Sequence, residues 1–140
     1  MGKPKQLMPL GGKSILEHSL DNLLGSRVDE VILVVGCEAE KVKKTAAGRK
    51  VRIAVNPDYR QGMSTSIARG LDLIGEGTKA IMVALADQPF ISSRIINQLI
   101  DEFETHQKGI AVPVYKGRRG HPIIFAIKYR GELLGLSGDT

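Results

Sequence analysis

Short apolar runs alternate along the chain with longer runs of mixed polarity. Largely continuous apolar and β-branched stretches occupy residues 30–35 and 80–85, a pattern typical of buried strands, and residues 51–55 are predicted to form a further strand. A fourth strand is predicted at residues 110–114. Residues 122–126 are predicted to form an edge strand, because the proline that opens them cannot donate to a ladder.

The longer runs have helical periodicity. Ser14 and Glu17 form an S-x-x-E capping box, and the leucines that follow trace one apolar face. Helices are expected at residues 14–24, 38–46 and 64–73, and in a long segment that begins at Ser92 or Ser93.

Strands that alternate with helices predict βαβ units, and therefore an α/β fold with a mostly parallel sheet. In such sheets ligands bind beyond the carboxyl ends of the strands. The loops that follow Val35, Val55 and Leu85 are therefore the first places to look for chemistry.

The amino-acid composition is that of an ordinary globular protein. A chain of 140 residues with 42% hydrophobic and 25% charged residues suits one globular domain. No apolar run is long enough to span a membrane, and no secretory signal is visible. The single Cys37 cannot form an internal disulfide, which fits a reducing cytoplasm.

The net charge of +5 favours anionic partners, such as nucleotides, phosphorylated metabolites or nucleic acids. With three Phe, three Tyr and no Trp, the chain has few stacking platforms for single-stranded nucleic acid. The densest basic cluster, within residues 41–52, is either a solvated helix end or a patch that faces a ligand.

Asp87 follows the third buried strand, in the segment Ala-Asp-Gln-Pro at residues 86–89. Mg²⁺ takes oxygen ligands and commonly uses one or two carboxylates together with substrate phosphates. Pro89 stiffens the loop, so the carboxylate would be held in place before binding. The alternative is an aspartate that only hydrogen-bonds within its own loop.

Residues 56–66 lead from a strand into a helix whose start is rich in hydroxyl groups. A helix N-terminus presents free N–H groups that can hold an anion. A plain N-cap by Ser64 explains the same residues.

Residues 118–122, Arg-Arg-Gly-His-Pro, could bind a phosphate or form an exposed turn. Lys5 could neutralise a phosphate or belong to an exposed tail.

Five motifs in order resemble one family. They are KPKQLMPLGGK at residues 3–13, NPDYRQGMSTS at 56–66, ADQP at 86–89, RRGHP at 118–122 and LSGD at 136–139. Together they resemble the MobA-like nucleotidyltransferases, in particular the molybdenum cofactor cytidylyltransferases. The resemblance implies a Rossmann-like three-layer sandwich of the GT-A-like nucleotidyltransferase type, formed as a single domain over residues 1–140.

The resemblance also implies a reaction and a nucleotide site. The terminal phosphate of molybdopterin-type cofactor attacks the α-phosphorus of CTP, pyrophosphate leaves, and Mg²⁺ or Mn²⁺ assists. Asp87 matches the family's metal-binding aspartate, and Lys5 its phosphate-neutralising lysine, so both are the expected catalytic residues. The expected nucleotide-binding residues are Lys5, Gly62, Met63, Ser64 and Ser66.

On the acceptor side, the resemblance assigns Arg119, Gly120 and His121 to the pterin, and Asp139 to a place near the reacting phosphates. The implied partners are a nucleoside triphosphate, with CTP favoured, a molybdopterin-type acceptor and a recipient molybdoenzyme, with no nucleic acid or membrane. Phosphoryl-type transfer needs alignment and charge neutralisation rather than a protein nucleophile.

The sequence departs from the family pattern at both ends. Relatives usually begin with a strand and a Gly-rich loop, of which only residues 1–5 match the tail. They also continue past residue 140 into an acidic segment that can supply a second metal ligand. Loss of a central strand would expose backbone groups on its neighbours, and loss of the loop would remove phosphate contacts. We therefore expect little or no activity from the 140-residue chain.

Other functions stay open at this level. A guanylyltransferase for the same cofactor, or a sugar-phosphate or polyol-phosphate nucleotidyltransferase, would use the same motifs. A catalytically inert binding module of the same fold is the alternative from another class. The base cannot be assigned because part of the nucleotide site is missing from the pattern.

Overall fold

A computed structural model describes residues 7–106, 109–115 and 118–131 of the chain. The helices are α1 (Ile15–Leu24), α2 (Ala39–Ala46), α3 (Met63–Leu71) and α4 (Ser93–His106), with 3-10 turns η2 (Tyr59–Gln61) and η3 (Ile127–Tyr129). The strands are β1 (Pro9–Leu10), β2 (Lys13–Ser14), β3 (Ile32–Val35), β4 (Arg52–Val55), β5 (Ala80–Val83), β6 (Ile110–Ala111), β7 (Val114–Tyr115), β8 (Arg118–Arg119) and β9 (Ile123–Ala126).

Helix α1 begins where its sequence predicts. The Ser14 hydroxyl accepts from the Glu17 N–H at 3.2 Å, and the Glu17 carboxylate accepts from the Ser14 N–H at 3.0 Å. These two bonds form a capping box, which satisfies donors that every helix start leaves free. Leu16 and Leu20, one turn apart, are buried against the sheet.

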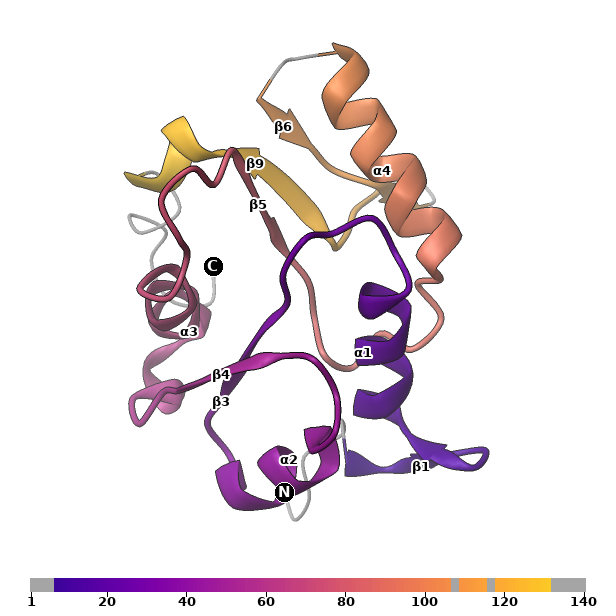
Figure 1. Ribbon diagram of the computed structural model, residues 1–140, viewed down its shortest axis with the longest axis vertical. Helices are drawn as coiled ribbons and strands as arrows, with labels where there is room; N and C mark the ends of the chain where they lie inside the picture. The colour runs from indigo at the N-terminus through magenta and orange to yellow at the C-terminus, as the bar shows by residue number, and fades with distance from the viewer. Residues whose placement is uncertain (1–6, 107–108, 116–117, 132–140) are drawn as a thin grey trace.

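The sheet is built in two halves. β3 and β4 pair in parallel, with Val35 opposite Val55, and form one half. The other half has the order β5-β9-β6, in which β9 runs antiparallel to both neighbours. Helices cover both faces: α1 contacts both α2 and α4, while α3 packs on β3 and β4 (Figure 1). The predicted α/β fold class is confirmed.

The prediction of an edge strand at residues 122–126 is wrong. Pro122 lies just ahead of β9 and takes no part in the ladder, so β9 can pair on both edges. The strand predicted at 110–114 ends at Ala111, because Pro113 has no N–H with which to continue it. The chain then leaves the sheet in the hairpin β7–β8, where the Gly120 N–H donates to the Pro113 carbonyl at 2.9 Å.

The main apolar core joins α1, α2 and β3. Leu16 and Leu20 from α1 meet Leu33 and Val35 from β3 and Val42 from α2. On the opposite face of β3, Gly70 brings α3 close: a Cβ at Gly70 would lie 3.3 Å from a Val34 methyl carbon. β3 is thus covered on both faces, as its continuous apolar run predicts.

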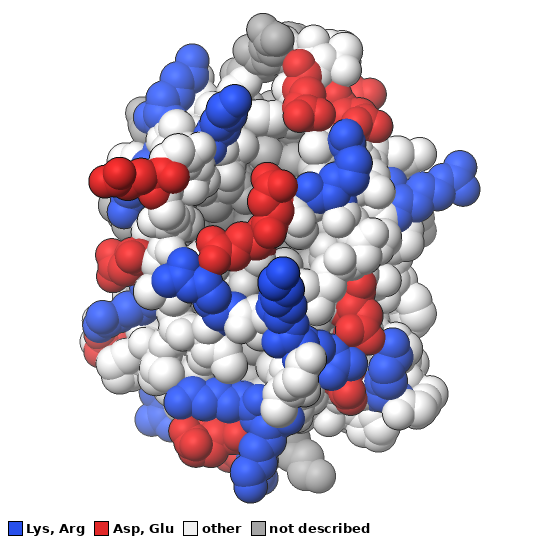
Figure 2. Space-filling view, viewed as in Figure 1, with Lys and Arg blue, Asp and Glu red and all other residues white. Residues whose placement is uncertain are grey.

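Charged side chains of both signs mix over the face seen in Figure 2. Within the basic cluster at residues 41–52, Arg49 pairs with Glu17 and Asp21, and Arg52 pairs with Glu30. Lys41 also pairs with an acidic side chain, one turn away. This pairing favours the solvated helix end over a ligand patch. No helix among the described residues is long and apolar enough to cross a membrane.

Asp21 links three segments of the amino-terminal half. Its carboxylate accepts from the Lys13 ammonium at 2.7 Å and from Arg49 Nε at 2.8 Å. Chiefly because of the Arg49 hydrogen bond, with Lys13 adding to it, the pKa of Asp21 falls from 3.8 to about 2. The ion pairs therefore stabilise the fold at every pH above the ordinary aspartate range.

We predict that Asp21→Asn lowers the free energy of unfolding at neutral pH by about 1 kcal/mol, a modest value because solvent screens the half-exposed carboxylate. A depressed pKa adds stability that is present above 3.8 and lost as the pH falls through about 2. Urea unfolding across this range should show the two proteins converging in acid. Asp72→Asn, at an exposed position, is the matched control. A difference that persists unchanged at low pH would contradict the assignment.

Candidate active site

Three loops leave the sheet at one edge. β3 and β4 are parallel, and β5 runs in the same direction, so the segments that follow all three strands emerge at the lower side of Figure 1. The turn after β3 meets the turn after β4 closely: a Cβ at Gly36 would lie 2.5 Å from Tyr59 Cβ. This is the edge at which α/β sheets bind ligands.

The loop after β5 is fastened to α1. Ser19 Oγ donates to the Ala86 carbonyl at 2.9 Å, and Asn22 Nδ2 donates to the Pro89 carbonyl at 2.9 Å. Two fixed carbonyls therefore flank Asp87, whose own side chain is exposed. Because the loop is tethered and the carboxylate is open to solvent, Asp87 is positioned to bind an external ligand.

His121 lies beside the same loop. Its neighbour Pro122 is fully buried and lines a small cavity together with Gln88, Ser19 and Ile96, so it packs the β9 start against the Asp87 loop. Burial lowers the pKa of His121 below its ordinary 6.5, and the nearby Asp87 carboxylate opposes that shift. The half-buried imidazole is therefore mostly neutral at pH 7.

The loop after β4 is organised by Asn56, which is fully buried. Asn56 Nδ2 donates to Thr65 Oγ1 and to Ser66 Oγ, both at 2.9 Å. Its carbonyl oxygen accepts from the Asp58 N–H at 3.0 Å. The side-chain polar groups of Asn56 thus hold the loop and the first turn of α3 in one arrangement.

Helix α3 begins one residue earlier than predicted. Gly62 occupies the N-cap position with φ 119° and ψ 167°, a conformation essentially restricted to glycine. No side chain caps the helix, so the N-cap by Ser64 is wrong. Ser64 lies inside the first turn, where the backbone N–H groups point toward the helix start.

The sequence-predicted site residues fall into three groups. Asp87 and His121 are brought together. Gly62, Met63, Ser64 and Ser66 form the start of α3, with Gly62 buried and Ser66 turned inward to Asn56. Lys5 and Asp139 lie outside the described residues, and Gly120 follows the hairpin strand that contains Arg119.

A cavity between β3 and β5 reaches toward both parts of the site. Ser66, in the first turn of α3, and Ala86, next to Asp87, border it, whereas Asp87 itself and residues 62–64 are not among its lining residues.

The donor set fits a hard divalent cation completed by a substrate. Within the described ranges, no three His, Cys, Asp or Glu side chains gather as a ready-made metal cage. Mg²⁺ needs no such cage when substrate phosphates and water complete its coordination. The exposed Asp87 carboxylate can serve in that way.

Sequence reasoning missed the residues that hold the site in place. Ser19 and Asn22 were not singled out within the predicted helix, and Asn56 was identified only as part of a loop. Their partners lie far along the chain, so no local pattern reveals them. The Asn-Pro pair at the end of a strand is the one signal that could have singled out Asn56.

We predict that NMR titration without added metal gives His121 a midpoint below 6.5. Because the Asp87 charge raises the pKa of His121, Asp87→Asn should lower this midpoint further. An unchanged His121 midpoint in Asp87→Asn would show that the two side chains do not interact.

Comparisons with known proteins give this site a context. Nicotine blue oxidoreductase from Paenarthrobacter nicotinovorans is 32% identical over 98% of this chain and 70% of that protein. Molybdenum cofactor cytidylyltransferase from Escherichia coli is 27% identical over 89% of this chain, which spans 62% of that enzyme. The crystal structure of Rv0371c from Mycobacterium tuberculosis with manganese has 30% identity and a TM-score of 0.86, covering 99% of this chain and 73% of that one.

The family match extends over the full length of the chain. Residues 1–140 match the MobA-like NTP transferase domain. The α/β architecture and the chain's likeness to the manganese-containing mycobacterial structure agree with that match. The chain belongs to the MobA-like NTP transferase family.

Proposed function

We propose that this chain is the catalytic part of a cytidylyltransferase that transfers CMP from CTP to the terminal phosphate of molybdenum cofactor, releasing pyrophosphate. One observation supports it above the others: an exposed carboxylate, Asp87, lies at the carboxyl edge of the sheet on a loop that Ser19 and Asn22 tether to α1. Membership of the MobA-like NTP transferase family supports nucleotidyl transfer. The molybdenum cofactor enzyme from Escherichia coli supports the choice of CTP and acceptor.

In this proposal Asp87 holds Mg²⁺, or Mn²⁺, which when bound neutralises charge on the triphosphate. The first turn of α3, from Gly62 to Ser66, receives the nucleotide through its backbone N–H groups. Asn56 keeps that turn in place before binding, so little ordering accompanies nucleotide binding. Lys5 is assigned to the phosphates, although it lies outside the described residues.

The acceptor phosphate approaches from the His121 side. A neutral imidazole can donate one hydrogen bond to an anionic acceptor without competing as a charge for the triphosphate. By resemblance, Arg119 and Gly120 are assigned to the acceptor and Asp139 to a place near the reacting phosphates. Because α-phosphorus attack needs alignment and charge neutralisation, these roles require no protein nucleophile.

Other substrates in the same family would use this geometry too. A guanylyltransferase or a sugar-phosphate or polyol-phosphate enzyme differs in base and acceptor, and an assay in which CTP, GTP, ATP and UTP compete separates these enzymes.

Redox chemistry is the second candidate, favoured by the 32% identical nicotine blue oxidoreductase. Reduction of nicotine blue by the same preparation, with no nucleotide triphosphate dependence, would support that candidate instead. An inert binding module would bind a nucleotide and turn nothing over.

We predict that Asp87→Asn weakens Mg²⁺-dependent CTP binding about tenfold or more, because a charged metal ligand is lost. NMR titration suits the measurement, since it detects binding even at millimolar dissociation constants. Asp29→Asn, just ahead of β3 at the opposite end of the sheet, is the matched control and should bind as the parent does. Equal CTP affinity in Asp87→Asn, or binding independent of Mg²⁺, would count against the proposal.

A further inference from the structure

The two sides of the candidate active site belong to different halves of the sheet. Gly62 stands at the start of α3, which packs on β3 and β4, whereas His121 comes just ahead of β9 in the other half. Phosphoryl-type transfer depends on the alignment of the groups that hold the two substrates. Any contact that fixes α3 relative to β9 therefore bears on the reaction.

The carboxyl-terminal end of α3 receives two guanidinium groups from the described chain. Arg52 Nη1 donates to the Leu73 carbonyl at 2.7 Å, and Arg130 Nη2 donates to the Leu71 carbonyl at 3.2 Å. Leu71 is the last residue of α3 and is buried. Cations are favourable at this end of a helix, because its last carbonyl groups lack partners within the helix and carry partial negative charge. The two arginines therefore hold the end of α3 that lies away from Gly62.

The two arginines come from different halves of the sheet. Arg52 opens β4, on which α3 packs, so it holds α3 to its own half. Arg130 follows β9 and η3. The Ile127 N–H, at the start of η3, donates to the carbonyl of Lys79, just ahead of β5, at 2.8 Å. The Arg130 hydrogen bond thus joins α3 to the half-sheet whose strand β9 begins beside His121.

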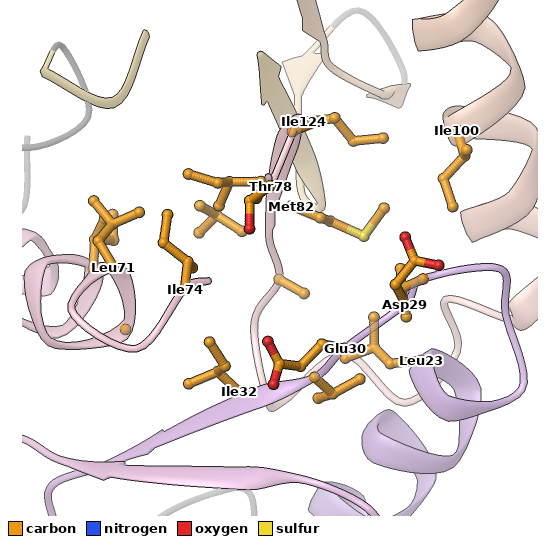
Figure 3. A pocket seen from close by; sticks show the side chains of 18 of the residues that line it. Leu23, Asp29, Glu30, Ile32, Leu71, Ile74, Thr78, Met82, Ile100 and Ile124 are labelled. Atoms are coloured by element: carbon orange, nitrogen blue, oxygen red, sulfur yellow. The ribbon is translucent and has the colours of Figure 1, made fainter. Parts of the chain in front are cut away.

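Apolar packing contributes little to this junction at the same place. Leu71 and Ile74 border the cavity between β3 and β5 from the α3 side, and Met82 borders it from β5 (Figure 3). Side chains that face one another across a cavity gain little dispersion energy from each other. The backbone of Leu71 is nevertheless fixed to the second half-sheet, because Arg130 donates directly to its carbonyl.

We propose that Arg130 is a positioning residue, which sets the place of the α3 start relative to His121 by holding the other end of the helix. α3 has nine residues. Its length of about 13 Å is short enough for it to move as a rigid rod, so a displacement at Leu71 reaches Gly62. Arg130 itself touches neither substrate. The ligands of the two sides rest on the proposed function, whereas the orientation of α3 can be measured without any ligand.

Residual dipolar couplings of backbone amides measure the orientation of α3 relative to β5 and β9. Arg130→Gln removes the charge and shortens the reach of the donor. Arg52→Gln is the matched control, because it removes the same kind of group from the same helix end but from the half-sheet on which α3 packs. One alignment tensor should fit α3, β5 and β9 in the parent and in Arg52→Gln, and should fail for α3 in Arg130→Gln. A single fit in Arg130→Gln, or equal failure in both variants, overturns the proposal.

A conservative variant separates positioning from loss of folding. Arg130→Lys keeps a cation beside the Leu71 carbonyl, so it should restore most of the parental orientation of α3. Circular dichroism checks that all three variants remain folded. An α3 orientation in Arg130→Lys that departs from the parent as far as that in Arg130→Gln contradicts the proposal.

A nucleotide titration then connects the position of α3 with the site. With Mg²⁺ present, Arg130→Gln should bind CTP roughly fivefold more weakly than Arg52→Gln does. Equal CTP affinities in these two variants, when the parent binds CTP, contradict the proposal. A parent that binds no CTP contradicts the proposed nucleotidyl transfer instead, and the dipolar couplings alone then decide the role of Arg130.

Discussion

The arrangement of this protein depends on the hydrogen bonds that α1 makes to the loop after β5. The two half-sheets share no backbone ladder in the described chain. Ser19 and Asn22 donate to Ala86 and Pro89, and Ser93 at the start of α4 donates back to the Asn22 carbonyl at 2.6 Å. One helix, packed by Leu16 and Leu20 on β3, thereby fixes the position of the other half-sheet.

These hydrogen bonds also determine how the residues of the candidate site are positioned. Asp87 projects from a loop whose neighbouring carbonyls are held, and buried Pro122 brings His121 against that loop from β9. Asn56 likewise holds the start of α3 in place, through its hydrogen bonds to Thr65 and Ser66. Metal, nucleotide and acceptor would therefore meet groups that are already placed, as charge neutralisation and alignment require.

The sequence predicted what local pattern determines. The capping box at Ser14 and the apolar runs of β3 to β5 depend on neighbouring residues, and the structure confirms them. The central place of β9 was missed because Pro122 suggests an edge, whereas the proline lies outside the ladder. The long-range partners of Asn56 and Ser19 were missed because the contacts exist only in the folded chain. The juxtaposition of Asp87 and His121 likewise follows from the fold.

The most direct test of this account is paramagnetic broadening by Mn²⁺ in the presence of CTP, read from the backbone amide spectrum. If the carboxyl edge forms one metal and nucleotide site, amides around Asp87, Gly62 and His121 will broaden together. Amides at the opposite end of the sheet, such as those of Asp29 and Thr78, will stay sharp. Broadening that spares the Asp87 loop, or that appears first at the opposite end, would contradict a nucleotidyl-transfer site at this edge.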